Sequence, residues 1–282
     1  MIRELSKVEP ARELCRLLGV ARSGYYAWLE RKESANAAKN RLLVEQIRQV
    51  YQAHQGNYGS PRITQALRGQ GQQCNRKRVE RLMRQAGLKG RTGKRRRVRT
   101  TNSDHDQPIA PNLLLDRPAP AKVDEVWVAD ITYVPTSEGW LFLAAVMDLY
   151  SRQILGWSLW ENLEAGGALQ ALARALVKRG NPKQVIHHSD RGIQYASALY
   201  REQLRRSGLL ASMSRKGNCY DNAAMEAFWS TLKREALEQS ASWPKDRVRR
   251  QIFQYIEAIY NRTRLHSSLG YKSPVDFEQQ NN

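Results

Sequence analysis

Apolar residues recur at helical spacing along the first 90 residues of the chain. Near the N-terminus, Leu14, Leu17 and Leu18 mark one helix that ends at Gly19, and a second helix begins near Ser23. Two helices joined by a short glycine-containing turn predict a helix-turn-helix within residues 1–35. This pattern is degenerate, so a plain helical hairpin stays open as the alternative.

A second helical module is expected over residues 40–90. Apolar positions with helical periodicity predict a helix around residues 43–51. Ser60 is expected as the N-cap of the next helix, with Pro61 at its first position. Asn75 is expected to cap a third helix that turns an apolar face inward, formed by Val79, Leu82 and Met83.

Residues 91–122 show no periodicity of either kind. They begin with the basic run Lys94, Arg95, Arg96 and Arg97 and continue with four prolines between positions 108 and 120. We expect a linker that is basic first and stiffened by proline later.

From Asp124 onward the pattern changes to mixed strands and helices, which we assign to one domain over residues 123–282. Three apolar runs, at residues 126–134, 141–147 and 153–160, predict an antiparallel meander. A helix at 163–179, a strand at 184–188, a helix at 199–206, a strand near 209–213 and two further helices are expected to follow. This order predicts an α/β fold of the RNase H-like class, a mixed five-stranded sheet flanked by helices.

Three acidic residues stand out in this domain. Asp130 interrupts the first apolar strand, Asp190 follows the fourth strand, and Glu226 lies one turn inside a helix that opens at Asp221 or Asn222. A carboxylate in a buried strand costs several kcal/mol unless something neutralises it. Converging carboxylates without matching Lys or Arg are explained by a divalent cation, and oxygen ligands select Mg²⁺ or Mn²⁺.

Each acid also has a structural interpretation when it is taken alone. Asp130 could be a hydrogen-bonded strand acid, Asp190 a turn residue or a partner of Arg191, and Glu226 an acid on a helix surface. Asp148, near the meander, is interpreted as a turn or salt-bridge residue.

Charge is distributed unevenly along a chain of net charge +19. Residues 1–110 contain 24 Lys and Arg against nine Asp and Glu, whereas residues 111–282 contain 22 against 18. A basic front half favours a polyanion-binding arm on a separate working domain. Membrane-surface binding is the rival, but no basic amphipathic helix with a continuous apolar face supports it.

Localisation follows from what the sequence does not contain. The longest apolar run, Leu141–Met147, is too short to span a bilayer, and no signal-peptide core is present. Three scattered cysteines fit neither a disulfide framework nor a zinc pair. We therefore expect a cytoplasmic protein with no membrane partner.

Several motifs together resemble those of a known family. Trp127-x-x-Asp130-Ile-Thr-Tyr133, His188-Ser-Asp190-Arg-Gly192 and Asp221-Asn222-Ala-x-x-Glu226 each contain one acid, and 35 residues separate the second acid from the third. Tyr260-Asn261-x-Arg-x-x-His266 and Tyr58-Gly59-x-Pro61-Arg62 add signatures outside the acid motifs. On these residues the chain resembles the OrfB-type catalytic subunit of IS-three family insertion-sequence transposases, DDE transposases of the retroviral integrase superfamily. Unlike the retroviral relatives, it has no His-His-Cys-Cys zinc set at the N-terminus.

The resemblance implies a DNA transposase that cleaves and joins strands at the ends of an insertion sequence without a covalent enzyme intermediate. Asp130, Asp190 and Glu226 are then both the catalytic residues and the ligands of two Mg²⁺ ions, for which Mn²⁺ can substitute. One ion would activate water or a DNA 3′-hydroxyl, and the other would stabilise the leaving oxygen. His188 is expected to support its strand rather than to bind metal.

The implied partners are double-stranded DNA, as terminal inverted repeats and as target, and further copies of the chain, at least a dimer. An upstream helix-turn-helix protein of the OrfA type is a possible partner, and a bacterial, nucleoid-associated location is implied. Terminal-end sequence and oligomer number cannot be derived from the chain.

Residues that contact DNA are expected in five places. Asn222 and Lys233 share the helix face of Glu226, and Arg215 and Lys216 form a basic loop at the cleft. Ser23 and Tyr26 are expected to distinguish the element ends. Arg264 and His266 are expected near the catalytic acids. Phosphate contacts are expected from Arg62, Arg76, Lys77, Arg78 and Arg81 and from the linker residues Lys94, Arg95, Arg96 and Arg97.

Two rival functions can be weighed. His188-x-x-Arg191 with Tyr220 resembles a fragment of a tyrosine recombinase site, but that interpretation leaves Asp130 unexplained. A non-catalytic helix-turn-helix regulator with a degenerate α/β domain is the second rival. The presence of all three acids argues against it.

Overall fold

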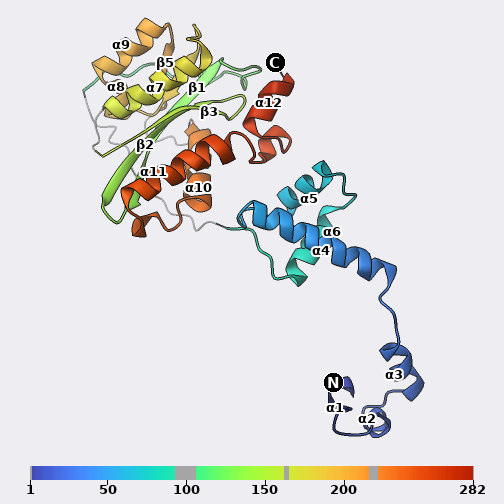
Figure 1. Cartoon of the computed structure of the whole chain (residues 1–282). Helices are drawn as coiled ribbons and strands as arrows, with labels where there is room; N and C mark the ends of the chain where they lie inside the picture. Colours follow the sequence, from blue (N-terminus) through green and yellow to red (C-terminus); the bar gives the residue numbers. More distant parts are fainter. Residues whose placement is uncertain (1, 93–105, 162–164, 216–221, 282) are drawn as a thin grey trace. The chain divides into compact units, whose positions relative to one another are not determined.

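The computed structural model describes residues 2–92, 106–161, 165–215 and 222–281 of the chain (Figure 1). It divides into two compact units, Met1–Lys89 and Gly90–Asn282, here called the N-terminal and C-terminal units. Among the described residues, no helix combines the length and apolarity that crossing a membrane requires.

The N-terminal unit is entirely helical where it is described. It begins with α1 (Ile2–Leu5), α2 (Ala11–Leu17) and α3 (Arg22–Leu29). Cys15 of α2 and Tyr25 of α3 are buried, at 1% and 6% exposure. Gly19 takes a left-handed φ of +62°, and the next amide, of Val20, donates to the Cys15 carbonyl. The expected helix pair with its glycine turn is therefore present.

Helices α4 (Ala35–Ala53), α5 (Ser60–Gly69) and α6 (Arg76–Gln85) form the rest of this unit. They share a buried apolar core that includes Ile47, Ile63, Leu67 and Val79. Asn75 caps α6 as expected, because its side chain accepts a hydrogen bond from the Arg78 amide. The expectation that Ser60 is an N-cap was wrong by one residue, since the extended residue Gly59 occupies that position.

A five-stranded sheet forms the centre of the C-terminal unit. Its strands are β1 (Val126–Thr136), β2 (Gly139–Asp148), β3 (Ile154–Trp160), β4 (Ile186–Ser189) and β5 (Leu210–Met213). Their order is β3-β2-β1-β4-β5, with β1 to β3 antiparallel and β4 parallel to both β1 and β5. The predicted mixed sheet is confirmed.

Helices cover both faces of this sheet (Figure 1). One face packs against α7 (Ala165–Arg179), α8 (Ile193–Ala196) and α9 (Ala198–Ser207). Gly156 of β3 allows α7 to approach closely, because a Cβ there would lie 2.2 Å from the Ala171 carbonyl oxygen. The other face packs against α10 (Ala223–Glu235), α11 (Lys245–Gln254) and the π-helical segment Tyr255–Tyr260 that continues α11.

Three features of the C-terminal unit were not expected from the sequence. The short helix α8 follows Asp190 closely, the long helix after Pro244 changes to π-helical geometry at Tyr255, and α12 (Pro274–Asn281) closes the chain. Two 3₁₀ turns, Ser240–Ser242 and Ser267–Leu269, connect these elements. Asn222 is the N-cap of α10, and Asp221 lies outside the described residues.

Candidate active site

Asp130 and Asp190 lie side by side where β4 ends against β1. The last parallel pair between these strands joins Ala129 to Ser189. Asp130 directly follows Ala129, and Asp190 directly follows Ser189. Asp190 follows the end of β4 as expected. Asp130 does not stand at a strand end, because β1 continues to Thr136 in register with β2. Asp130 therefore lies inside β1, as its place in the first apolar run predicted.

The alternation of side chains along β1 determines which face Asp130 occupies. Trp127 and Ala129 pack towards α7, whereas Val126 and Val128 pack towards α10 and α11. Side chains two residues apart on a strand point to the same face of the sheet. Asp130 therefore lies on the face of Val126 and Val128, towards α10.

Helix α10 brings Glu226 to this place through two contacts with β1. The Asn222 side-chain amide donates to the Ala129 carbonyl at 3.2 Å. The Trp229 indole Nε1 donates to Asp130 Oδ2 at 2.9 Å. Glu226 lies between these two residues in the first turn of α10 and is exposed.

The three acids share one electrostatic environment. The pKa of Asp130 is raised to about 8, first because burial penalises its charged form and then because Asp190 lies nearby. Glu226 raises the same pKa further, while hydrogen bonds from Trp229 and from the Ile131 amide lower it. Like charges this close repel one another, and a cation between them would relieve that repulsion.

The carboxylate oxygens of these acids fit a hard divalent cation, although the three side chains do not form a complete ligand set. Among the described residues, no three His, Cys, Asp or Glu side chains already stand as a ready-made metal cluster. Asp130 Oδ1 accepts from the Ile131 amide and Asp190 Oδ1 from the Gly192 amide, each at 2.9 Å. A carboxylate oxygen that accepts one hydrogen bond keeps a second lone pair, so both groups can still bind a metal.

Lys233 lies near the acids on the same helix. Burial lowers its pKa, and the Asp130 carboxylate acts in the opposite direction, which shows that the two groups lie within electrostatic reach. Lys233 is only partly buried.

Tyr195 is a neighbour of the acids that the sequence did not reveal. This α8 side chain is 3% exposed, and its hydroxyl has no hydrogen-bond partner among the described residues. Burial raises its pKa most, Tyr200 adds to the effect, and Asp130 and Asp190 contribute as well. Nothing in the local sequence marks it, because its position depends on how α8 folds back after β4.

The two histidines before Asp190 support the strand. His188 Nδ1 lies 2.8 Å from Ser212 Oγ and its Nε2 lies 3.3 Å from Ser214 Oγ, so both ring nitrogens have hydroxyl partners. Burial, with His188 nearby, lowers the pKa of His187 to about 3, so this ring is neutral beside Tyr200.

Arg264 and His266 are not beside Asp130, Asp190 and Glu226, which corrects the sequence expectation. Arg264 makes a two-pronged ion pair with Glu235, at 2.8 and 2.9 Å, and His266 lies next to it. Glu235 is nine residues beyond Glu226 on α10, a distance of about 13 Å along the helix. These residues hold the far end of the helix that carries Glu226.

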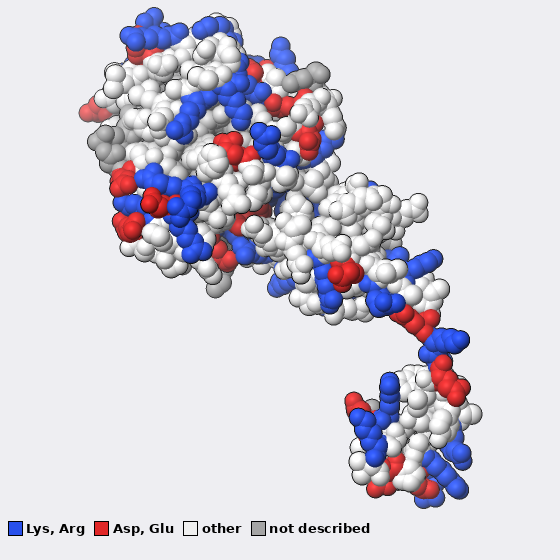
Figure 2. All heavy atoms as spheres, in the orientation of Figure 1, with Lys and Arg blue, Asp and Glu red and all other residues white. Residues whose placement is uncertain are grey.

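The remaining predicted DNA contacts occupy varied environments. Arg76, Lys77 and Arg81 on α6 and Ser23 and Tyr26 on α3 are exposed, and so is Arg215 after β5. Arg62 lies over the Tyr58 ring, and Arg78 donates to the Asn40 side chain. On the face shown in Figure 2, basic side chains are spread over both units. Lys216 and the run Lys94, Arg95, Arg96 and Arg97 lie outside the described residues.

Known protein families match the N-terminal and C-terminal parts of the chain separately. Residues 120–219 match the family described as Integrase core domain, and residues 207–274 match a second family of that description. Residues 37–97 match the HTH-like domain family.

Two curated relatives align with nearly the whole chain. The uncharacterized 31 kDa protein of insertion element IS600 from Shigella sonnei is 42% identical, covering 94% of this chain and 97% of its own length. The transposase InsF for insertion sequence IS3A from Escherichia coli (strain K12) is 40% identical, covering 95% and 93%. Among solved structures, the HTLV-2 integrase catalytic core domain in complex with magnesium covers 56% of this chain and 98% of its own, at 13% identity and a TM-score of 0.43.

The relatives and the core domain together settle the class of protein. Identity of 40% across 95% of the chain is well above what a shared fold alone would require. The integrase core coincides with the sheet that carries Asp130 and Asp190, and the helix-turn-helix-like match coincides with α4 to α6. The chain belongs to the IS3 family of insertion-sequence transposases, DNA-binding enzymes of the DDE type.

Proposed function

We propose that Asp130, Asp190 and Glu226 are the catalytic acids of this transposase and that they bind two Mg²⁺ ions, which Mn²⁺ can replace. The observation that supports this assignment is the environment of Asp130, whose pKa is raised first by burial and then by two acids, Asp190 after β4 and Glu226 from α10. Asp190 and Glu226, from two distant segments of the chain, thus lie within electrostatic reach of Asp130. A structural role for any single acid does not explain why all three are close.

The reaction is cleavage and strand transfer at the ends of an insertion sequence, by in-line attack of water or a 3′-hydroxyl on a phosphodiester. When bound, the cations supply Lewis-acid stabilisation and a more nucleophilic oxygen at neutral pH. The rigid strands β1 and β4 hold Asp130 and Asp190 at fixed spacing. Glu226, exposed on the first turn of α10, approaches from the solvent side and completes the ligand set.

Contacts with DNA are proposed for both units. Asn222, the N-cap of α10, and Lys233, two turns beyond Glu226, are proposed to hold a phosphate near the acids. Arg215 and Lys216 are proposed to add basic contacts to DNA. The exposed α6 residues Arg76, Lys77 and Arg81, together with Arg62, Arg78 and the linker run 94–97, are proposed to contact the DNA backbone. Ser23 and Tyr26 on α3 are proposed to distinguish the element ends.

Residues 1–35 and 40–90 are proposed to act as two DNA-binding modules, joined by the linker at 91–122 to the catalytic domain at 123–282. Pairing two element ends requires at least two copies of the chain. An OrfA-type protein is a further proposed partner, and a location on the bacterial nucleoid follows from DNA binding. A purely regulatory function is not favoured, because the matched relatives include transposases over nearly their full length.

The variant Glu226→Gln tests this function. It keeps the size and hydrogen-bonding capacity of an exposed side chain but removes its charge. We expect Mg²⁺-dependent cleavage of DNA carrying the element ends to fall by about 10³-fold or more, because transition-state stabilisation by the cation amounts to several kcal/mol. Binding of the same DNA in a mobility-shift assay should be unchanged.

Glu238→Gln is the matched control. Glu238 is an exposed acid just beyond α10 whose partner is Arg91 rather than the catalytic acids. Its loss should leave cleavage within about twofold of the wild-type rate, a change below 0.5 kcal/mol. If Glu226→Gln retained both binding and cleavage in Mg²⁺, the assignment of the acids would be wrong.

A further inference from the structure

We propose that Trp229 is a positioning residue for the catalytic acids: its indole N–H fixes the orientation in which the Asp130 carboxylate receives a cation. The inference rests on the proposed metal-binding function of Asp130 and names a residue outside the three acids. It begins from a single contact, the 2.9 Å hydrogen bond from Trp229 Nε1 to Asp130 Oδ2.

With that contact, each oxygen of the Asp130 carboxylate accepts one hydrogen bond. The amide of Ile131 donates to Oδ1 from within β1, and Trp229 donates to Oδ2 from α10. A carboxylate held from two sides cannot rotate freely about its Cβ–Cγ bond. Each oxygen still keeps one lone pair for a metal. Donors of this kind, bonded to a ligating carboxylate, set its direction and contribute to metal affinity.

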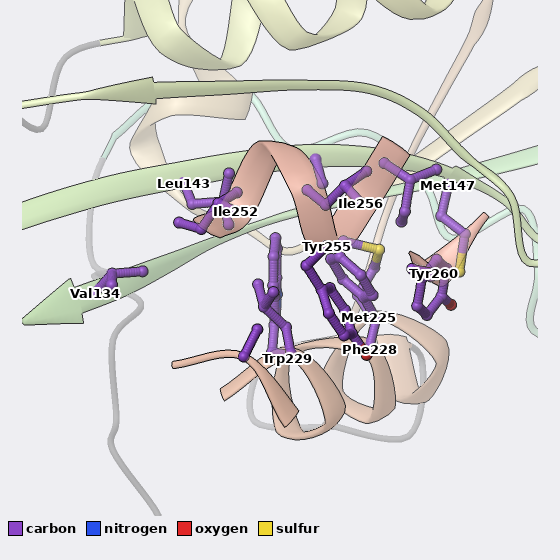
Figure 3. Close-up of a cluster of buried hydrophobic side chains, with 14 of the residues drawn as sticks. Val134, Leu143, Met147, Met225, Phe228, Trp229, Ile252, Tyr255, Ile256 and Tyr260 are labelled. Carbon is purple, nitrogen blue, oxygen red and sulfur yellow. The ribbon is translucent and has the colours of Figure 1, made fainter. Parts of the chain in front are cut away.

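The Trp229 ring is itself held firmly. It is 6% exposed, and it packs against Phe228 with ring centroids 4.7 Å apart. Figure 3 shows it projecting from α10 into the cluster that contains Ile252, Tyr255 and Ile256. Because a buried ring of this size has no room to swing, its N–H points at a fixed place, where Asp130 lies.

Sequence spacing ties the same ring to Glu226. Residues three apart on a helix share one face, so Trp229 and Glu226 project towards the same side of α10. The hydrogen bond therefore sets the distance between the helix that carries Glu226 and the strand that carries Asp130. Loss of the N–H should loosen both ligands at once.

If the hydrogen bond of Trp229 had only a structural role, its loss would not change metal binding. The C-terminal unit offers a second tryptophan hydrogen bond for comparison. A buried Trp N–H needs an acceptor, so any such bond could serve only to satisfy the indole. Trp157, a partly buried tryptophan on an edge strand of the same sheet, donates from Nε1 to Glu257 Oε1 at 2.7 Å. Trp229 differs from Trp157 in that its acceptor is one of the three proposed metal ligands.

The experiment is Mn²⁺ titration of the full chain without DNA, followed by calorimetry and by the loss of free-Mn²⁺ electron paramagnetic resonance signal. The variants are Trp229→Phe, Trp157→Phe and Asp130→Asn. In a fourth protein, 3-benzothienylalanine is introduced at position 229 by amber suppression. This analogue keeps the shape of the indole but replaces its N–H by sulfur, which separates loss of the donor from loss of packing.

We expect Trp229→Phe and the benzothienyl analogue each to weaken Mn²⁺ binding by about tenfold or more, as is typical when such a donor is removed. Trp157→Phe should bind Mn²⁺ as the wild type does. Unchanged or tighter binding by the benzothienyl analogue would overturn the inference even if Trp229→Phe folded poorly. If Asp130→Asn bound Mn²⁺ as well as the wild type, the metal assignment of Asp130 would fail first, and the role of Trp229 with it.

Discussion

Asp130 is held in an environment that penalises its own charge. It sits on the core-facing side of a central strand, with Asp190 beside it, and its pKa is raised to about 8. An ordinary aspartate in the unfolded chain has a pKa near 3.9. Without a cation, the folded chain therefore binds a proton at Asp130 that the unfolded chain would release.

The sign of the resulting pH dependence follows directly. Between about pH 4 and pH 8 the folded state holds more protons, so stability falls as pH rises through this window and levels off above it. Asp130→Asn carries no charge and keeps a single acceptor oxygen, so either Ile131 or Trp229 loses its acceptor by the same amount at every pH. We expect this variant to gain stability over the wild type by at most about 1.4 kcal/mol per pH unit across the window.

Urea unfolding in EDTA at several pH values measures this difference. Adding Mn²⁺ at pH 8 should reverse the order of stability, since the cation binds the ionised wild-type site in the folded state only. A stability difference that did not change with pH would show that the carboxylate is not strained by its surroundings.

Sequence reasoning reached Asp130, Asp190 and Glu226 because each stands in a recognisable local motif. It did not reach Trp229 or Tyr195, whose significance depends on contacts across the fold. In the sequence, Trp229 has the pattern of an ordinary core residue of an amphipathic helix, and only the packing of α10 on β1 places its N–H against Asp130. Residues of this kind carry no signal in a single sequence.

At the scale of elements, α10 is held at both ends. Its N-cap, Asn222, and Trp229 in its second turn attach it to β1. Its last turn carries the buried Glu235, which accepts from Arg264 and from the Tyr255 hydroxyl at 2.8 to 2.9 Å. The segment that follows the π-helical turn thus acts as an anchor for the helix that carries Glu226.

Breaking that anchor should be costly. Arg264→Met leaves the buried, charged Glu235 with the longer 3.4 Å contact to Arg234, and we expect a loss of about 3 kcal/mol in unfolding free energy. The double variant Arg264→Met/Glu235→Leu removes both charges and should recover most of the loss. Urea denaturation followed by circular dichroism measures both.

A surface pair on α9 provides the control for this experiment. Glu202 and Arg205 form an ion pair, with Arg205 Nε 2.8 Å from Glu202 Oε2, but both side chains are exposed. Arg205→Met should therefore have little effect on the free energy of unfolding, because water screens an exposed pair. Equal losses for the single and double variants at positions 264 and 235 would contradict the anchor interpretation.

The order and type of most elements in the C-terminal unit could be predicted from periodicity, but two local features could not. Nothing in the residue pattern after Asp190 predicts the short helix α8, whose position depends on how the chain folds back after β4. The change from α to π geometry at Tyr255 has no signature in the apolar spacing of residues 248–260.

At the scale of the whole molecule, the excess of positive charge belongs to the first 110 residues. The exposed cations of α6 and the linker run 94–97 are proposed to bind the DNA backbone. Replacing Lys94, Arg95, Arg96, Arg97 and Arg99 by serine should weaken binding to all DNA sequences alike. The slope of log affinity against log salt should become shallower by about 0.9 for each DNA phosphate that the variant no longer neutralises.

Fluorescence anisotropy with element-end and unrelated duplexes, over a range of KCl concentrations, tests this expectation. A loss of sequence preference with an unchanged salt slope would contradict it.

The first helix pair is expected to act in the opposite way. Substituting Ser23 and Tyr26 by alanine should reduce the ratio of affinities for element-end and unrelated DNA, while the salt slope changes little. The same anisotropy titrations measure this ratio. A uniform loss of affinity for both duplexes would assign α3 to backbone binding instead.

The most direct test of the central claim is the location of Mn²⁺ by anomalous scattering in crystals of the chain bound to element-end DNA. The account predicts Mn²⁺ bridged by Asp130 and Asp190, with Glu226 ligating one ion from the first turn of α10. Saturating Mn²⁺ that left no ion between these carboxylates, with the three side chains still apart in the presence of DNA, would contradict it.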